Sequence, residues 1–407
     1  MKKIHYAWVV CAAGTLTMIC VMGFCCSLLS AYLPYIVASG LSASAGSAIV
    51  GISSTATLLA ISVISRYYSR FSLRTGITLA LLLGAVSMVL FSVGGSAVVY
   101  FVAAFAAGTA LGLGGSVPQS LLIGAWFRGR RGTALGIVSA GSGVATIFFP
   151  VLIDRLVSFV GLRGMFLCAA TFILVAALVV WRLIRSAPEE MGLAPYGEVV
   201  AAVVEKPSAA NALAPAGWVV LMVLMVIQGG YSPAPSHLAV IMTDSGYAPE
   251  RAAFLLSLYG IFVTAGKFFF GTMVDWVGAK RTTLFAYCVA VAGCLGVLFM
   301  DGQQLWPCVA TALLLGVGVP PNTVGIALLA TDISSPATYT NTVKWMEISS
   351  YVGCIVMGFM PGILRDAFGS YRGGYMLMAL WAALSIPLLF LLYRVRRSTG
   401  KENLSYQ

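Results

Sequence analysis

Apolar residues run along this chain in long blocks rather than at the spacing of amphipathic helices. Residues 75–91 and 165–181 contain no charged side chain at all. A helix needs roughly 20 mostly apolar residues to cross a bilayer core of about 30 Å. These blocks therefore predict membrane-spanning helices, and the chain as a whole is expected to be an all-α membrane protein.

Twelve such blocks can be delimited along the chain. They are residues 8–33, 45–66, 74–94, 97–126, 132–153, 164–184, 217–242, 251–274, 281–300, 304–330, 339–364 and 374–394. A polar stretch with four prolines, residues 185–216, separates the sixth block from the seventh. We therefore expect a six-helix bundle over residues 1–188, a cytoplasmic linker over residues 189–214, and a second six-helix bundle over residues 215–407.

The composition supports a membrane protein and explains the net charge. Hydrophobic residues make up 60% of the chain and charged residues 9%, whereas soluble domains carry about 25% charged residues. The net charge of +11 is unevenly placed, with 17 basic residues in the loops and termini on one side of the predicted spans and 5 on the other. Basic loops stay cytoplasmic. The excess charge thus predicts a cell inner membrane protein with both termini cytoplasmic, and no nucleic-acid partner.

Short internal matches relate the two halves. An offset of 206 residues pairs Ser69 with Asp275 and Arg74 with Lys280, in the loops after the second helix of each half. An offset of 209 pairs residues 159–166 with residues 368–375, before the sixth helix of each half. Offsets near half the chain length predict two pseudo-symmetric six-helix units, a common plan among transporters.

The loop between the predicted eighth and ninth spans carries a recognisable pattern. Residues 271–281 read GTMVDWVGAKR, which resembles the signature G-x-x-x-D-x-x-G-x-[KR]-[KR] of the major facilitator superfamily. Glycine permits a tight turn between membrane helices, and the cations hold the loop inside. The first-half copy departs from the pattern, because Ser69 replaces the acid and Ser72 the glycine.

Three further stretches are similar to the monocarboxylate transporter and oxalate:formate antiporter branch of that superfamily. They are WFRGRRGTALG at 126–136, PEEMGLAPYG at 188–197 and HLAVIMTDSG at 237–246. The resemblance implies the major facilitator fold, twelve transmembrane helices as two six-helix bundles. It also implies a monomeric secondary active transporter, a symporter or antiporter that moves a small organic anion, a monocarboxylate, by alternating access.

Lys267 is the most deeply placed charge in the predicted spans. It lies eight residues before Asp275, so roughly 12 Å along the helix from that cytoplasmic end, which exceeds the reach of a lysine that snorkels to the interface. Charges inside a membrane usually face a polar path or each other, so a structural ion pair is the alternative. The resemblance implies that a basic residue at this place binds the substrate carboxylate. Val263 stands where the animal-type relatives of the branch carry an acid.

Other candidate substrate-binding residues lie in the first, fourth, seventh and tenth spans, which surround the cavity in the implied fold. They are Tyr32, Ser116, Gln119, Gln228, Tyr231 and Asn322. Polar and small residues also serve helix packing in membranes, so a packing role is the alternative for each of them.

Coupling or gating has its own candidates. His237 is one of two histidines, and histidine titrates near neutral pH. Lys344 and Glu347 are three residues apart, a spacing that also permits a structural pair on one helix face. The loop residues Asp275 and Arg281 complete the group.

The sequence also argues against an enzyme or a cofactor-binding protein. The sequence contains no phosphate-binding loop, nucleophile triad or metal-ligand spacing, so we expect no enzyme and no cofactor, with the proton as the candidate coupling ion. Two rival functions stay open. One is a proton-coupled exporter of drugs or other lipophilic compounds, and the other is a transporter-like membrane sensor.

Overall fold

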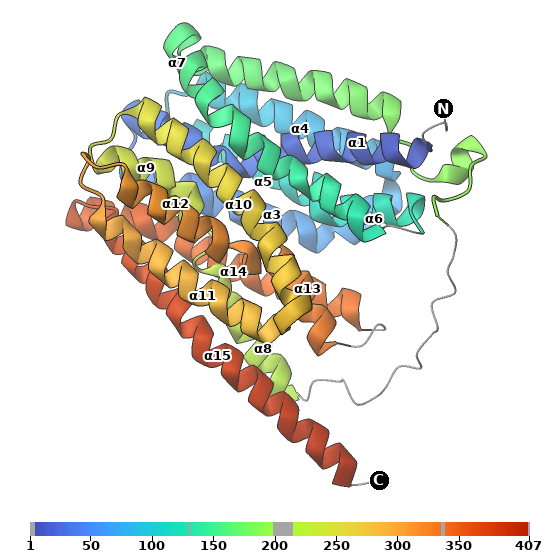
Figure 1. Cartoon of the computed structure of the whole chain (residues 1–407). Coiled ribbons are helices and arrows are strands. Elements are labelled where there is room, and N and C mark those ends of the chain that lie inside the picture. The colour runs from blue at the N-terminus through green and yellow to red at the C-terminus, as the bar shows by residue number, and fades with distance from the viewer. Residues whose placement is uncertain (1–4, 129–130, 198–214, 335–337, 406–407) are drawn as a thin grey trace. The chain divides into compact units, whose positions relative to one another are not determined.

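The computed structural model describes residues 5–128, 131–197, 215–334 and 338–405, and the regular elements of these ranges are helical (Figure 1). The first part of the chain contains α1 (Tyr6–Met18), the π-helix η1 (Ile19–Ser27), α2 (Leu29–Ala38), α3 (Ala43–Arg70), α4 (Leu73–Val93), α5 (Ala97–Gly114), α6 (Ser116–Trp126), α7 (Arg131–Leu183) and the 3₁₀ turn η2 (Pro188–Met191). The second part contains α8 (Pro215–Gly229), η4 (Ala234–His237), α9 (Leu238–Asp244), α10 (Pro249–Val277), α11 (Ala279–Gly296), η5 (Val297–Phe299), α12 (Trp306–Gly318), η6 (Pro320–Asn322), α13 (Val324–Ile333), α14 (Tyr339–Phe368) and α15 (Arg372–Ser405).

The helices supply the twelve predicted membrane crossings. Ten described helical segments are long and apolar enough to span a membrane, and the bent pair Trp306–Asn322 with Val324–Ala330 adds an eleventh. One of the ten, Ala134–Leu183, has 50 residues, about 75 Å at the rise of an α-helix. Gly161 interrupts it with φ 72° and ψ 173°, so this segment provides two crossings and completes the twelve.

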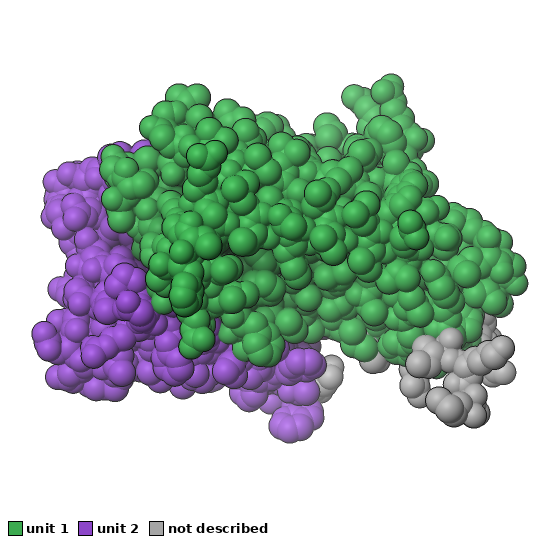
Figure 2. All heavy atoms as spheres, turned by 90° about the horizontal axis from the view of Figure 1, so that it is seen from above, with its two compact units in different colours: residues 1–41, 48–203 green, residues 42–47, 204–407 purple. Residues whose placement is uncertain are grey.

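The chain forms two compact units. Residues 1–41 and 48–203 make the first, and residues 42–47 and 204–407 make the second (Figure 2). Residues 198–214 of the predicted linker lie outside the described residues, and α8 begins directly after them at Pro215. The six residues 42–47, which include the first residues of α3, group with the second unit.

Local sequence fixes where several helices begin and end. The Ser72 and Ser96 hydroxyls accept the N–H groups of Thr75 and Val99 at 3.2 and 3.4 Å, so they cap α4 and α5. Gly278 ends α10 with φ 85°, a conformation that only glycine adopts without strain. The first-half loop does not need that glycine, because Ser72 has φ −61°. This difference explains how serine replaces glycine in the first copy of the loop motif.

Glycines allow close helix contacts in the first unit. A methyl group built on Gly108 would lie 2.0 Å from the Ser53 carbonyl oxygen, and one on Gly141 would lie 2.5 Å from the Thr15 carbonyl oxygen. These contacts bring α5 against α3 and α7 against α1. Only a residue without Cβ permits such approach, which is a common device of membrane helices.

The second unit repeats both contacts. A methyl group on Gly316 would lie 2.8 Å from the Phe262 backbone, and one on Gly353 would lie 1.8 Å from the Val226 carbonyl oxygen. Each residue follows its first-unit counterpart by 208 to 212 positions. The repeat inferred from short loop matches therefore extends into the helix packing.

Candidate functional site

Four predicted spans are interrupted in the described part of the chain. The first contains the π-helix η1 between α1 and α2, and the fourth breaks at Gly115 between α5 and α6. The seventh runs from α8 through a turn and η4 into α9, and the tenth breaks at η6 and Thr323, whose φ and ψ are −126° and −89°. Broken helices expose backbone groups at membrane depth and commonly build the sites of transporters.

Buried polar atoms without a hydrogen-bond partner coincide with these breaks. Within the described residues, such atoms occur on one candidate residue in each interrupted span: Tyr32, Gln119, His237 and Asn322. The remaining ones are the hydroxyls of Ser47, Ser257 and Thr311. Leaving a buried polar group unpaired costs about 1–3 kcal/mol. Because these four side chains each lie on a different interrupted span, they are candidates for ligand contact.

In the first unit, Tyr32 and Gln119 are fully buried. The Tyr32 ring packs edge-on against Phe166 with centroids 5.1 Å apart, and its hydroxyl lacks a hydrogen-bond partner among the described residues. Gln119 donates from Nε2 to the Gly114 carbonyl at 3.3 Å, while its Oε1 accepts no described hydrogen bond. Ser116, the first residue of α6, is exposed.

In the second unit, a hydrogen-bonded cluster joins the seventh, ninth and tenth spans. Gln228 donates from Nε2 to the Pro321 carbonyl at 3.0 Å and accepts the Tyr287 hydroxyl at Oε1. Tyr231 donates to the Gly318 carbonyl at 3.4 Å. These contacts satisfy carbonyls that the break in the tenth span leaves open. Gln228 and Tyr231 therefore stabilise the break, and Tyr287, which the sequence pattern did not single out, supports Gln228.

Asn322 and His237 differ from this cluster. The buried Asn322 amide lies beside the Tyr231 hydroxyl. His237 is fully buried at the end of η4, next to the Gly358 backbone of α14.

Lys267 lies in α10 and is half-buried. One residue earlier, a methyl group on Gly266 would lie 2.4 Å from the Gly316 carbonyl oxygen of α12. Three residues later, the Phe270 ring lies 3.2 Å from the position of a methyl group on Gly325 in α13. Because Gly316 and Gly325 flank the break in the tenth span, Lys267 lies at the level of that break.

The predicted coupling and gating residues are not brought together by the described contacts. Lys344 is exposed and its ammonium lies 5.9 Å from the Trp345 ring centroid. The ion pairs among described side chains are Arg365–Asp244 and Arg396–Asp332, so the structural pairing considered for Lys344 with the half-buried Glu347 is not formed. The three-residue spacing brings the two onto adjacent turns, but Lys344 projects toward Trp345 instead.

The loop residues of the superfamily motif lie where the sequence placed them. Asp275 is in the last turn of α10, and its side chain lies outside the described residues. Arg281 is exposed in the first turn of α11. Their roles in gating stay a prediction.

The basic residues that the internal repeat pairs, Arg74 and Lys280, have equivalent environments. The Arg74 guanidinium lies 4.0 Å from the Trp181 ring centroid and donates from Nε to the Trp181 carbonyl at 2.8 Å. The Lys280 ammonium lies 4.7 Å from the Phe390 ring centroid. Trp181 and Phe390 are 209 positions apart. A cation–π contact between the third and sixth helix is thus repeated in both units.

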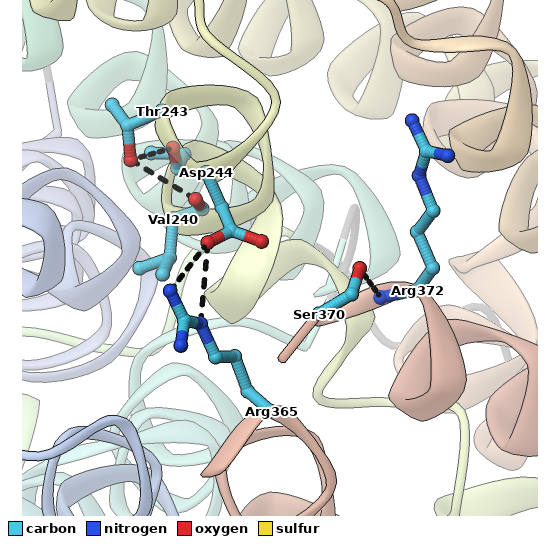
Figure 3. A network of polar contacts seen from close by, with 7 residues as sticks. Val240, Thr243, Asp244, Arg365, Ser370 and Arg372 are labelled. Carbon is cyan, nitrogen blue, oxygen red and sulfur yellow. Dashed lines mark hydrogen bonds and ion pairs between the residues drawn. The ribbon is translucent and has the colours of Figure 1, made fainter. Parts of the chain in front are cut away.

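An arginine network joins helix ends in the second unit (Figure 3). Arg365 of α14 forms an ion pair with Asp244, at the end of α9, at 3.2 Å. Arg372 donates its backbone N–H to the Ser370 hydroxyl at 3.2 Å and its Nη2 to the Met300 carbonyl at 2.7 Å. The ion pair is partly exposed, and such pairs contribute about 0–1 kcal/mol, so this network orients helix ends more than it stabilises the fold.

Two of the motif stretches that suggested the family branch meet in the first unit. Arg128 donates its N–H to the Tyr196 carbonyl at 2.9 Å, and Tyr196 donates its N–H to the Trp126 carbonyl at 2.8 Å. The Trp126 indole donates to the Arg185 carbonyl at 2.8 Å. Trp8 packs on the rings of both Phe127 and Tyr196. The segment after the sixth span is therefore fastened to the start of the first span and the end of the fourth.

Comparison with protein families gives a match over nearly the whole chain. The family model described as Major Facilitator Superfamily matches residues 15–343 and, separately, residues 219–406. An MFS-type transporter of Gibberella moniliformis is 25% identical to this chain over 62% of the length of this chain. Monocarboxylate transporter 13 of Rattus norvegicus is 24% identical over 67% of the length of this chain. The matches cover 59% and 64% of those relatives, so the chain spans less than two thirds of their length.

Other similar proteins carry other names. A probable sugar efflux transporter of Helicobacter pylori is 24% identical over 55% of this chain and 54% of its own. Among solved structures, the nucleoside transporter NupG is 12% identical with a TM-score of 0.72, covering 96% of this chain and 99% of its own. A bacterial homologue of the human lysosomal transporter Spinster is 17% identical with a TM-score of 0.69, covering 98% and 99%. At these identities the structures show the fold alone.

Proposed function

Because the chain belongs to the Major Facilitator Superfamily, we propose that it is a secondary active transporter that moves a small organic monocarboxylate across the membrane by alternating access. The observation that carries the substrate class is the position of Lys267, a half-buried cation at the level of the break in the tenth span. The similarity to monocarboxylate transporter 13 supports the same class.

Lys267 attracts the carboxylate in this proposal. A bound carboxylate accepts a charge-assisted hydrogen bond from the Lys267 ammonium, which contributes about 1.5–3 kcal/mol. The side chain presents a point charge rather than the bidentate fork of arginine. A point charge of this kind suits the single carboxylate of a monoanion.

In this proposal the residues for proton coupling, like the carboxylate-binding Lys267, belong to the second unit. His237 is a buried imidazole beside the Gly358 backbone, and we propose it as the residue that takes up a coupling proton, since histidine titrates near neutral pH. Lys344 and Glu347, together with the loop residues Asp275 and Arg281, are assigned to gating at the cytoplasmic end. Tyr32, Gln119 and Ser116 contribute polar contacts from the first unit.

An exporter of uncharged or lipophilic compounds is the alternative. The similarity to a probable sugar efflux transporter favours it. The first unit offers Asp154, which accepts a hydrogen bond from the Tyr35 hydroxyl, as its acid near the outer end of the fifth span. An exporter of this kind does not depend on a cation at position 267.

Uptake by proteoliposomes separates these functions. We expect the purified protein to take up radiolabelled short monocarboxylates, and Lys267→Ala to lower the rate at low substrate concentration by roughly ten- to a hundredfold, the loss of one charge-assisted hydrogen bond. Lys267→Arg is expected to keep part of the activity.

Arg251→Ala is the matched control, because Arg251 is an exposed cation in the first turn of the same helix, and its removal is expected to leave uptake unchanged. Uptake that is equal in wild type and Lys267→Ala would contradict the role of Lys267. Binding of carboxylates without any flux would instead favour a membrane sensor.

A further inference from the structure

We propose that the two half-helices that follow the breaks in the fourth and tenth spans act differently during transport: α13 is a movable gate held by the carboxylate of Asp332, and α6 is fastened in place. The inference rests on the proposed function, because a gate serves a transporter. It adds a difference in movement between the two units, which the helix plan that they share does not require.

The half-helices α6 and α13 are equivalent in the internal repeat. Each follows a break, at Gly115 and at Thr323, and they end at Trp126 and Ile333, toward the predicted cytoplasmic side. These ends are 207 positions apart, close to the offsets of the loop matches. Hinges are a few residues at the ends of elements that absorb backbone rotation, so a short helix behind a break can pivot there. The contacts at its far end therefore decide whether it moves.

The end of α6 is fastened by backbone, indole and ring contacts. The Tyr196 N–H donates to the Trp126 carbonyl at 2.8 Å, and the Tyr196 carbonyl accepts the Arg128 N–H at 2.9 Å. The Trp126 indole donates to the Arg185 carbonyl at 2.8 Å, and Trp8 of α1 packs on the Tyr196 ring with centroids 5.6 Å apart. Because these contacts use no charged side chain, neutralising a charge does not release α6.

The end of α13 is held to α15 by one carboxylate. Asp332 accepts a hydrogen bond from the Tyr393 hydroxyl and forms an ion pair with Arg396 at 3.5 Å. The side chains of Asp332 and Arg396 are 38% and 30% exposed, and ion pairs of such exposure stabilise weakly. The chain after the twelfth span stays in α15 up to Ser405, so it does not return to α13 as residues 184–197 return to α6.

The internal repeat places this carboxylate contact in the second unit. At an offset of 209, three polar residues of the second unit stand in place of apolar residues of the first: Asp332 for Ile123, Tyr393 for Ile184 and Arg396 for Ala187. Ile123 and Ile184 are fully buried. Water competes for exposed hydrogen bonds to a carboxylate, whereas buried apolar packing excludes it. The second unit therefore holds its half-helix by a contact that can open.

Hydrogen exchange of the full-length protein in detergent, read by mass spectrometry, tests the inference, because it reports the local opening of helices. We expect the amides of residues 324–333 to exchange at least about tenfold faster than those of residues 116–126. Asp332→Asn is expected to raise exchange in residues 324–333 by about three- to tenfold more, with residues 116–126 unchanged. Tyr196→Ala is expected to raise exchange in residues 116–126 alone, since Trp8 loses its ring contact.

Glu250→Gln is the matched control, because Glu250 is an exposed carboxylate in the first turn of α10, and it is expected to leave both segments unchanged. Tyr393→Phe removes only the hydroxyl donor and is expected to raise exchange in residues 324–333 as Asp332→Asn does. It decides the outcome if Asp332→Asn unfolds the whole protein. Equal exchange of the two half-helices in wild type, or unchanged exchange of residues 324–333 in Tyr393→Phe, would overturn the inference.

Uptake measurements test whether the movement of α13 is a gate. The pair Asp332→Cys and Tyr393→Cys is joined by a short bismaleimide, with the reaction verified by mass spectrometry, and is expected to lose uptake of short monocarboxylates. Each single variant, and wild type as the blank, should keep its uptake under the same treatment. Unchanged uptake in the joined protein would overturn the gate. No uptake by untreated wild type, with the expected exchange pattern, would overturn the proposed function and leave the difference between α6 and α13 standing.

Discussion

At the scale of single residues, the carboxylate of Asp301 shows how one side chain organises a loop outside the spans. It accepts the backbone N–H groups of Gln304 and Gln303, both at 2.9 Å, and these two hydrogen bonds lower the pKa of Asp301 from its ordinary value near 3.8. The neighbouring Tyr247 donates its hydroxyl to the Gln304 carbonyl at 2.6 Å, and burial raises the pKa of Tyr247 to about 12. The loop between η5 and α12 is therefore closed by ionised Asp301 and neutral Tyr247 at neutral pH.

Asp301→Asn is expected to lower the thermal unfolding midpoint at pH 7, because the amide accepts the same N–H groups less strongly than a carboxylate does. Since the folded-state pKa is depressed, the stabilisation by ionised Asp301 is fully present above the unfolded value and is lost as the pH falls through the folded value. The difference between wild type and variant should therefore be constant from pH 7 to 5 and shrink in more acidic buffer. A difference that grows in acid would show that the carboxylate does not act through these bonds.

The sequence alone identifies polar residues within the spans, but not which hydrogen bonds their side chains make. Tyr231 and Asn322 are equivalent candidates by position, yet the hydroxyl of Tyr231 binds the Gly318 carbonyl and the amide of Asn322 binds no described carbonyl. The distinction depends on which carbonyls the break in the tenth span leaves open. The groups that satisfy those carbonyls come from other spans, so the sequence of the tenth span by itself does not specify them.

At the scale of elements, helix contacts depend on a few glycines. Gly108 of α5 leaves room for the Ser53 carbonyl of α3, whereas Gly136 of α7 would meet no described atom within 4 Å of an added methyl group. Both glycines lie within helices, so their intrinsic cost to helix stability is the same. Their substitution should therefore separate packing from propensity.

Gly108→Ala is expected to destabilise the protein by about 1–3 kcal/mol, because a methyl group 2.0 Å from a backbone oxygen forces the helices apart. Gly136→Ala should be neutral or stabilise by about 0.5–1 kcal/mol, since alanine favours the helix and the site is open. Thermal unfolding of the two purified variants measures both effects. Equal losses in the two variants would contradict the packing role of Gly108.

The element boundaries were largely predictable, and the interruptions were not. The long apolar blocks predict twelve spans because length and hydropathy decide whether a helix crosses a membrane. The loop glycine Gly161 separates the fifth and sixth spans as expected, although the chain stays helical on both sides of it. The π-helix over Ile19–Ser27 has no comparable signal, because its sequence ICVMGFCCS is as apolar as its surroundings.

At the scale of the whole molecule, the two units share one plan but divide the chemistry. Both contain the glycine contacts and the cation–π contact at equivalent positions. The second unit contributes the half-buried Lys267 and the cluster of Gln228, Tyr231 and Tyr287 at the break in the tenth span. Two units that share a helix plan but differ in their polar residues fit the repeat organisation that is common among transporters.

The distribution of basic residues makes a prediction about orientation that tests the whole arrangement. With 17 basic residues on one side and 5 on the other, the basic loops should be cytoplasmic, and so should both termini. Ser69→Cys near the basic end of α3 and Ser158→Cys near the Gly161 break in α7 replace exposed hydroxyls of the first unit, on opposite predicted sides of the membrane. A membrane-impermeant maleimide should label Ser158→Cys in intact cells, and Ser69→Cys only after permeabilisation. The native cysteines lie within the spans, so the unmodified protein serves as the blank. The reverse labelling pattern would place the basic loops outside, and the gating role proposed for Asp275 and Arg281 would then belong to the outer face.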